Sequence, residues 1–181
     1  MNIPTLETER LILREWRESD LTNFAKFKLN KDAARFVMTS YTVAEAWRAM
    51  AYMAGHWLLR GYGNWSVEHR ESGEHIGYCG HYYPLEWPEP EIGWTIYPDH
   101  QRQGFATEAA AASVTFAYEK LGWKTAMSLI AADNTPSLAV ATRLGAMFES
   151  SIQYRGFDCG IYRHLNHTDF HIHSKEKLKW H

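Results

Sequence analysis

Apolar and polar residues follow two different periods along this chain, and each period predicts a different kind of element. Short segments with a two-residue period or a continuous apolar run, bounded by glycine, proline or polar turns, predict strands, whereas apolar residues repeated every three or four positions predict helices. The expected strands are residues 10–14, 65–69, 75–83, 91–97, 125–131, 147–153 and 158–164, and the expected helices begin at Ser19, Val43, Thr107 and Pro136. The resulting order is βααβββαβαββ.

Local signals mark the ends of these helices. Thr42 and Glu45 form a capping box before the second helix, which Gly61 ends, and Gly122 and Gly145 close the third and fourth helices. Hairpins give antiparallel pairs of strands, whereas a strand-helix-strand crossover gives a parallel pair. We therefore expect an α/β fold built on a twisted mixed sheet that is flanked by helices.

The composition indicates one globular domain. The 181 residues are 45% hydrophobic and 22% charged, with a formal net charge of −2, and a chain of this size buries one substantial core. We expect the domain to span residues 1–166 and to be followed by a tail, residues 167–181, in which the apolar periodicity is lost. A homodimer contact through this tail is compatible with its residues but is not required by them.

The same features disfavour several classes of function. An apolar run of about 18 residues and a basic-then-apolar leader are both missing, so we expect no membrane span, no secretory signal and a cytoplasmic location. The near-neutral charge argues against nucleic acid as the main ligand. The two cysteines, Cys79 and Cys159, fit a reducing compartment as packing residues. No native metal is expected, because no metal-site spacing accompanies the histidines at positions 164, 167, 171 and 173.

The hexapeptide QRQGFA, residues 101–106, carries the most specific chemistry. It lies between an expected strand and a long Ala-rich helix, where unpaired N–H groups and the positive end of the helix dipole favour an anion. Gly104 lets the backbone approach a ligand closely, and the small Ala106 leaves the amides open. The segment lacks the glycines of a dinucleotide fingerprint and the lysine of a P-loop. The alternative is an ordinary strand-to-helix turn that contains a glycine.

The spacing of Gln101, Gly104 and Ala106 resembles the Q/R-x-x-G-x-G/A signature of the GNAT acyltransferases. The segment NTPSLAVATRLGA, residues 134–146, resembles the family's N-x-x-S segment and the helix that follows it. ETERLILREWRESDL and GFATEA resemble the RimJ/RimL-type branch. Together these matches cover about residues 5–165. The resemblance implies a GNAT fold and the transfer of an acetyl group from acetyl-CoA to a primary amine.

The resemblance also implies which residues bind acetyl-CoA. The amides of residues 103–107 would hold the pyrophosphate, flanked by the side chains of Gln101 and Arg102, and a backbone N–H of the preceding strand would stabilise the charge that develops on the thioester carbonyl. Asn134 would bridge the strand end and the coenzyme arm, or act as a helix cap. The implied coenzyme-binding residues are Trp94, Thr95, Ile96, Gln101, Arg102, Gln103, Gly104, Phe105, Ala106, Thr107, Asn134 and Ser137.

Two residues are candidates for proton transfer. A protonated amine must lose a proton before it attacks, and the expected base is Glu91, whose alternative role is that of a polar residue at a strand start. The departing thiolate would take a proton from Ser137, because Ala141 occupies the position where many family members have a tyrosine. Alternatively, Ser137 only supports the first turn of its helix. Glu108, in the first turn of the preceding helix, is expected to be structural and to hold a neighbouring loop.

The sequence leaves the acceptor open. A protein or peptide N-terminus is favoured. The alternative enzyme acts on a small amine such as a polyamine, amino sugar, amino acid or drug, and the alternative of a different class is a catalytically silent acyl-CoA-binding module.

The acceptor cleft is expected to be lined by residues 37–41, the Pro-rich loop 84–90 and the turn 154–157. Its aromatic walls would be Tyr41, Trp87 and Tyr154. Three carboxylates in this region would favour a cationic acceptor: Glu86, Glu89 and Glu91. The alternative is that they are merely solvated in loops.

Overall fold

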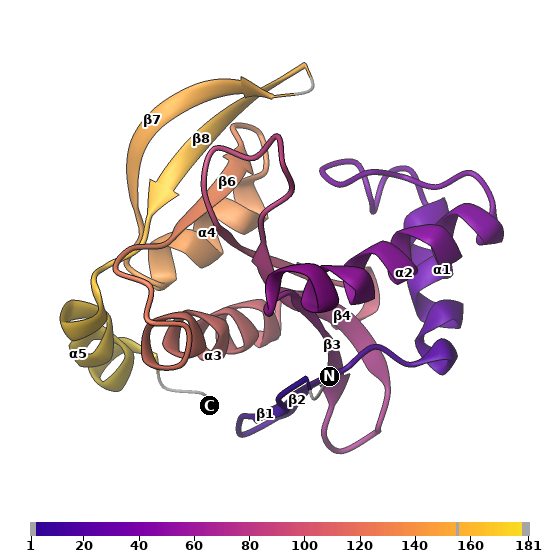
Figure 1. The fold of residues 1–181 in the computed structure, drawn as a ribbon, viewed down its shortest axis with the longest axis horizontal. Coiled ribbons are helices and arrows are strands. Elements are labelled where there is room, and N and C mark those ends of the chain that lie inside the picture. The colour runs from indigo at the N-terminus through magenta and orange to yellow at the C-terminus, as the bar shows by residue number, and fades with distance from the viewer. Residues whose placement is uncertain (1–2, 155, 179–181) are drawn as a thin grey trace.

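A single eight-stranded sheet organises the computed structural model, which describes residues 3–154 and 156–178 (Figure 1). The strands are β1 (Leu6–Glu7), β2 (Leu11–Arg14), β3 (Asn64–His69), β4 (His75–Tyr82), β5 (Glu91–Ile96), β6 (Met127–Ala131), β7 (Met147–Tyr154) and β8 (Phe157–Arg163). Their order across the sheet is β1-β2-β3-β4-β5-β6-β8-β7. Neighbouring strands are antiparallel except β5 and β6, which are parallel. The mixed sheet predicted from the sequence is confirmed.

Five α-helices flank the sheet: α1 (Leu21–Leu29), α2 (Val43–Arg60), α3 (Phe105–Glu119), α4 (Thr135–Arg143) and α5 (His167–Lys177). α3 is the crossover between the parallel strands. The hydroxyl of Thr42 caps α2 by accepting the N–H of Glu45, and Gly61 ends that helix in the left-handed conformation with φ 76°. Both ends of α2 therefore follow from the signals in the sequence.

Different helices cover the two faces of the sheet. On one face, α3 packs on the sheet in a core that includes Ile92, Ile96, Phe105, Ala109 and Val114. On the other face, α1 and α2 pack on it in a core that includes Phe24, Phe27, Met50, Tyr78 and Tyr97. Because side chains alternate along a strand, Glu91 faces the side of α1 and α2, opposite to Ile92.

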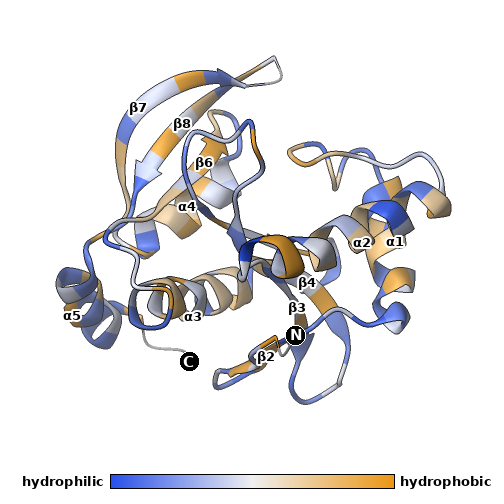
Figure 2. Ribbon diagram, viewed as in Figure 1, coloured by the Kyte–Doolittle hydropathy of each residue, from blue (hydrophilic) through white to orange (hydrophobic). Residues whose placement is uncertain are grey.

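Besides two short 3-10 helices, Glu18–Asp20 and Pro98–His100, the described residues form two elements that the sequence pattern did not predict, α5 and β1. The sequence predicts a tail in residues 167–181, whereas His167–Lys177 form α5, which begins after the cap residue Asn166. Phe170, 2% exposed, is the one buried residue of α5, and the helix is drawn mainly in hydrophilic colours in Figure 2. A helix with a single buried side chain leaves almost no periodic signal. β1 is too short to show one. The domain boundary after residue 166 stays a prediction.

Within residues 3–154 and 156–178, the helices lack the combination of length and apolar character that crossing a bilayer requires. Cys79 and Cys159 are both buried and free. The described side chains include no group of three or more His, Cys, Asp or Glu residues arranged to hold a metal ion.

His81 of β4 is fully buried beneath α3, with 0% of its surface exposed. Its Nε2 lies 3.1 Å from the carbonyl oxygen of Ser113, so this nitrogen carries the proton and donates it. The rings of Tyr62, Trp65 and Trp123 surround the imidazole. Burial lowers the pKa of His81 to about 4.

Replacing His81 with Gln should make the free energy of unfolding less sensitive to acid. The imidazole of an unfolded chain has a pKa of about 6.5, so the neutral buried form contributes stability that is complete above that pH and is lost as the pH falls towards 4. Between pH 7 and pH 4.5, the wild type should lose roughly 2 kcal/mol more than His81→Gln. Urea unfolding at both pH values measures this, and equal losses would contradict the neutral buried state.

Candidate functional site

β5 and β6 are joined at one point and then separate. The pair has a single bridge, between Glu91 and Met127, at the start of both strands. Beyond it the strands diverge towards their C-terminal ends, where the segments leading to α3 and α4 begin. In the described sheet, one edge of β5 therefore lacks a neighbouring strand from Ile92 onward.

At the point where the strands separate, two side chains form hydrogen bonds in place of the missing backbone bonds between β5 and β6. Glu91 Oε1 accepts the backbone N–H of Leu129 (3.0 Å), and the hydroxyl of Ser128 donates to the carbonyl oxygen of Ile92 (2.6 Å). His164 Nε2 lies 2.9 Å from the Ser128 oxygen. Because the hydroxyl proton is committed to Ile92, the imidazole is the donor. Burial lowers the pKa of His164 to about 4 and so keeps it neutral.

The backbone of β5 presents alternate residues to its open edge. Ile92 turns its carbonyl group towards β6, so the alternation of a strand turns the backbone groups of Trp94 and Ile96 the same way. Thr95 belongs to the other series and faces β4, as does Tyr97, which donates its N–H to that strand. Trp94 and Ile96 therefore face the open edge, and Thr95 does not.

The segment between β5 and α3 is a tight turn with two left-handed residues. Arg102 has φ 62° and Gly104 has φ 84°. α3 begins at Phe105, earlier than the sequence predicts, and its N-cap Gly104 supplies no capping side chain. The first helical bond runs from the N–H of Glu108 to Gly104. The three N–H groups of residues 105–107 precede this ladder and are available to an anion.

Gln101 and Gln103 shape this turn. The side chain of Gln101 donates from Nε2 to the carbonyl oxygen of Ile96 (2.8 Å), which ties the turn back to β5 and commits that amide within the protein. The side chains of Arg102 and Gln103 are exposed. The carbonyl oxygen of Gln103 accepts a hydrogen bond from Nη1 of Arg10 (3.0 Å).

Glu91 is buried, with 8% of its surface exposed. Burial raises the pKa of Glu91 to about 8, against the opposing effects of the Leu129 N–H and the nearby indole N–H of Trp87. Trp87 belongs to the Pro-rich loop and packs edge-on against Tyr82 and Tyr154, with ring centroids 5.0 and 4.6 Å apart. A carboxyl in this setting exchanges protons near neutral pH, as a general base requires.

Asn134 and Ser137 lie on the opposite side of the separation, at the start of α4. The Asn134 side chain accepts the backbone N–H of Ser137 (3.3 Å), which confirms its predicted role as a cap. Ser137 is half-buried. Ala141 is fully buried, with 0% exposed. Contacts of Asn134 and Ser137 with a coenzyme stay predictions.

The structure bears on part of the predicted acceptor cleft. Trp87 and Tyr154 do pack edge-on, whereas Tyr41 is 72% exposed and its place in the aromatic wall stays a prediction. Glu89 is already paired, because Arg163 donates to both of its oxygens (2.6 and 2.7 Å). This leaves less negative charge for a cation than three loop carboxylates would supply. Arg155, in the predicted turn 154–157, lies outside the described residues.

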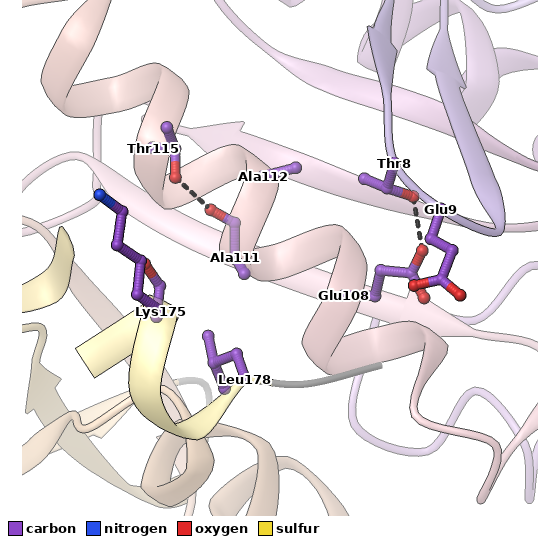
Figure 3. A pocket seen from close by; sticks show the side chains of 9 residues that line it. Thr8, Glu9, Glu108, Ala111, Ala112, Thr115, Lys175 and Leu178 are labelled. Atoms are coloured by element: carbon purple, nitrogen blue, oxygen red, sulfur yellow. Dashed lines mark hydrogen bonds between the residues drawn. The ribbon is translucent and has the colours of Figure 1, made fainter. Parts of the chain in front are cut away.

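A cavity of about 310 Å³ lies away from these residues, beside α3 and α5 (Figure 3). Figure 3 shows the hydroxyl of Thr8 directed at Glu108, to which it donates (2.6 Å). The cavity is lined by Thr8, Glu9, Glu108, Ala111, Ala112, Thr115, Ser174, Lys175 and Leu178. It shares no residue with the opening between β5 and β6, so we do not assign it to the reaction.

Sequence reasoning missed three residues that shape the site. Ser128 and His164 act through the register of β6 and β8, and nothing in their local sequence marks them. Arg10 lies within the ETERL segment that resembles the RimJ/RimL-type branch, so the sequence held a signal for it, but not its contact with Gln103.

Fold and site together define a class of protein: an α/β domain in which an anion-binding turn follows a strand with an open edge and a buried carboxyl. This is the arrangement expected of an enzyme that transfers an acyl group from a coenzyme with a phosphate-bearing end.

Comparison with known proteins gives the family. The acetyltransferase (GNAT) domain model matches residues 10–147. YoaA of Bacillus subtilis, an uncharacterized N-acetyltransferase, is 27% identical over 153 residues, which cover 83% of this chain and 86% of YoaA. An acetyltransferase structure from Agrobacterium tumefaciens is 31% identical with a TM-score of 0.82, over 92% of this chain and 96% of that chain.

A structure of RimL, an alpha-N-protein acetyltransferase of a ribosomal protein in complex with coenzyme A, has a TM-score of 0.73 at 19% identity, over 90% of this chain and 98% of that chain. This likeness shows the fold. The chain belongs to the GNAT acetyltransferase family, in its RimJ/RimL-type branch, and is an N-acetyltransferase. The predicted family and fold are confirmed.

Gly104→Ala should weaken the binding of acetyl-CoA. The left-handed φ of 84° disfavours a side chain, and an added Cβ would lie 3.2 Å from Nη2 of Arg10, so the turn and the direction of its amides must change. We expect the KM for acetyl-CoA to rise about tenfold with little change in kcat, since backbone strain of roughly 1–2 kcal/mol falls on binding.

Gly73→Ala is the matched control. Gly73 also has a left-handed φ, 69°, and its added Cβ would have no neighbour within 4 Å. It lies in the hairpin turn between β3 and β4. This variant should lose similar stability without a change in KM, and an unchanged KM in Gly104→Ala would contradict the assignment of the turn.

Proposed function

We propose that this N-acetyltransferase moves the acetyl group of acetyl-CoA directly to the primary amine at a protein or peptide N-terminus, in a ternary complex without a covalent acetyl-enzyme. The observation that carries the proposal is the position of Glu91, a buried carboxyl with a raised pKa where β5 leaves β6. From there β5 leads to the anion-binding turn. A coenzyme lying along the open edge of β5 would bring its thioester towards Glu91.

Residues on both sides of the opening between β5 and β6 bind acetyl-CoA. The amides of residues 103–107 bind the pyrophosphate, and Arg102 adds a positive charge. The backbone groups of Trp94 and the N–H of Ile96 pair with the pantetheine arm as an added strand would, and one of these two N–H groups stabilises charge on the thioester carbonyl oxygen. Asn134 and Ser137 contact the arm from the side of α4.

The transfer balances in protons and bonds. The acceptor arrives as an ammonium group, and the ionised carboxylate of Glu91 takes one proton. The amine nitrogen attacks the carbonyl carbon, the C–N bond forms and the C–S bond breaks. The thiolate takes a proton from the hydroxyl of Ser137, which regains one from the second proton that the nitrogen releases. The products are an acetamide and coenzyme thiol.

Exposed apolar side chains favour a protein as the acceptor. Met38, Tyr41, Leu85 and Phe157 are 65%, 72%, 94% and 45% exposed. Met38 and Tyr41 lie in the connection from α1 to α2, Leu85 lies in the connection from β4 to β5, and Phe157 begins β8. Figure 1 shows both connections at the same end of the molecule as the start of β8. Apolar groups gathered around an opening suit a protein surface better than a small solvated amine. RimL, with the same fold, supports the proposal by analogy.

The experiment is the release of coenzyme thiol from acetyl-CoA. It compares short peptides with free N-termini, the same peptides with acetylated N-termini, a pool of small amines, and a blank. We expect release with free peptides alone. Release with small amines alone would contradict the proposal that the acceptor is a protein or peptide N-terminus. Silence in every pool, with coenzyme binding retained, would favour a binding module over an enzyme.

Glu91→Gln should remove a proton-acceptor step. With both substrates saturating, the kcat of the wild type should rise with an apparent pKa near 8, because only the ionised carboxylate takes the proton and burial raises the pKa of Glu91 to about 8. Glutamine keeps an acceptor for the Leu129 N–H but does not titrate. We expect kcat to fall by roughly 10²–10⁴-fold and the rise with pH to disappear.

The control is Glu119→Gln, which changes an exposed carboxylate at the C-terminal end of α3. It should leave the level and the pH profile of kcat unchanged. A Glu91→Gln enzyme that kept the wild-type profile would rule out Glu91 as the base.

A further inference from the structure

Arg10 connects the segment before β2 to the anion-binding turn. Its Nη1 donates to the carbonyl oxygen of Gln103 (3.0 Å) and its Nε donates to Oε2 of Glu108 (2.8 Å). Its Nη2 forms an ion pair with the same Oε2 at 2.7 Å. The guanidinium also lies over the ring of Phe105, 4.8 Å from its centroid. Gln103 precedes α3, and Phe105 and Glu108 lie in its first turn, so one side chain spans the junction of turn and helix.

Glu108 holds Arg10 in this position. Its carboxylate is buried, with the residue 1% exposed. Oε1 accepts hydrogen bonds from the hydroxyl of Thr8 (2.6 Å) and from the backbone N–H of Arg10 (2.8 Å), while Oε2 accepts one from Nε of Arg10. A buried carboxylate that accepts three hydrogen bonds and forms an ion pair has little freedom to move. The predicted structural role of Glu108 in holding a neighbouring segment is confirmed.

The bond from Arg10 to Gln103 sets the direction of the next amide. In a trans peptide, the carbonyl group and the following N–H point in opposite directions. Because the carbonyl oxygen of Gln103 is turned to Arg10, the N–H of Gly104 is turned away from Arg10. Arg102 and Gly104 both have left-handed φ angles, and for arginine this conformation is unfavourable. A turn of this kind keeps its shape when a neighbour fixes one of its carbonyl groups.

We propose that Arg10 is a positioning residue for the coenzyme: by holding the Gln103 carbonyl, it keeps the Gly104 N–H and the first-turn amides of α3 directed at the pyrophosphate. The inference rests on the proposed function of the turn. Its action requires the forked guanidinium, because the single ammonium of lysine does not match the geometry that bonds Glu108 and Gln103 together.

The first test is the affinity for coenzyme A, measured by calorimetry on the full chain. Arg10→Met should raise the Kd about tenfold, and Arg10→Lys should stay closer to Arg10→Met than to the wild type. Arg70→Met is the matched control, because Arg70 donates to Glu7 and to the carbonyl of Thr8 on the same segment. It should keep the wild-type Kd. Thermal unfolding checks that each variant is folded.

The second test uses acetyl-pantetheine, a donor without the pyrophosphate. In Arg10→Met, kcat/KM should fall about tenfold with acetyl-CoA and stay unchanged with acetyl-pantetheine, whereas general damage to the fold would lower both.

Equal losses with the two donors, or wild-type affinity in Arg10→Met or Arg10→Lys, would overturn the inference. A wild type that failed to bind coenzyme A would instead overturn the proposed function on which the inference rests.

Discussion

The separation of β5 from β6 after a single bridge is the constraint on which the site depends. Unpaired backbone groups inside a protein cost about 1–3 kcal/mol each, and here Glu91 and Ser128 satisfy the first two that the ladder loses, on Leu129 and Ile92. Beyond them the edge of β5 is open to a ligand. The same divergence brings the start of α3 and the start of α4 to opposite sides of one opening, so the place where the ladder stops fixes the place of binding.

The anion-binding turn shows how a local motif depends on distant residues. Gly104 supplies the left-handed conformation and the free amides of α3 supply the donors, and both follow from a few neighbouring positions. We propose that the orientation of those donors depends on Arg10, which is far away in the sequence and is itself held by Glu108. On this proposal the amides are pre-oriented when the sheet folds, and binding of the coenzyme would not have to order them.

Elements with strong local signals could be predicted from the sequence, and contacts across the fold could not. The capping residue Thr42 and the terminal Gly61 marked α2, and the position of Glu91 at the start of β5 followed from the strand pattern. α5 was not predicted because Phe170 alone is buried in it. The contact between Ser128 and His164 could not be predicted, because it depends on how the strands align across the sheet. Burial of Glu91, which decides its pKa, likewise depends on how the Pro-rich loop packs.

Trp87 links the access to Glu91 with the pKa of that carboxyl. An acceptor amine must come within about 3 Å of the carboxylate, directly or through one water, yet Glu91 is 8% exposed. An amine that approached from the side of the Pro-rich loop would have to displace Trp87 from Tyr82 and Tyr154, at a cost of roughly 0.5–1.5 kcal/mol for each aromatic pair. This cost is small, while Arg163 still holds the loop through Glu89. Burial is thus what raises the pKa of Glu91 into the range in which it exchanges protons with an amine, because the indole N–H of Trp87 stabilises the carboxylate and opposes that rise.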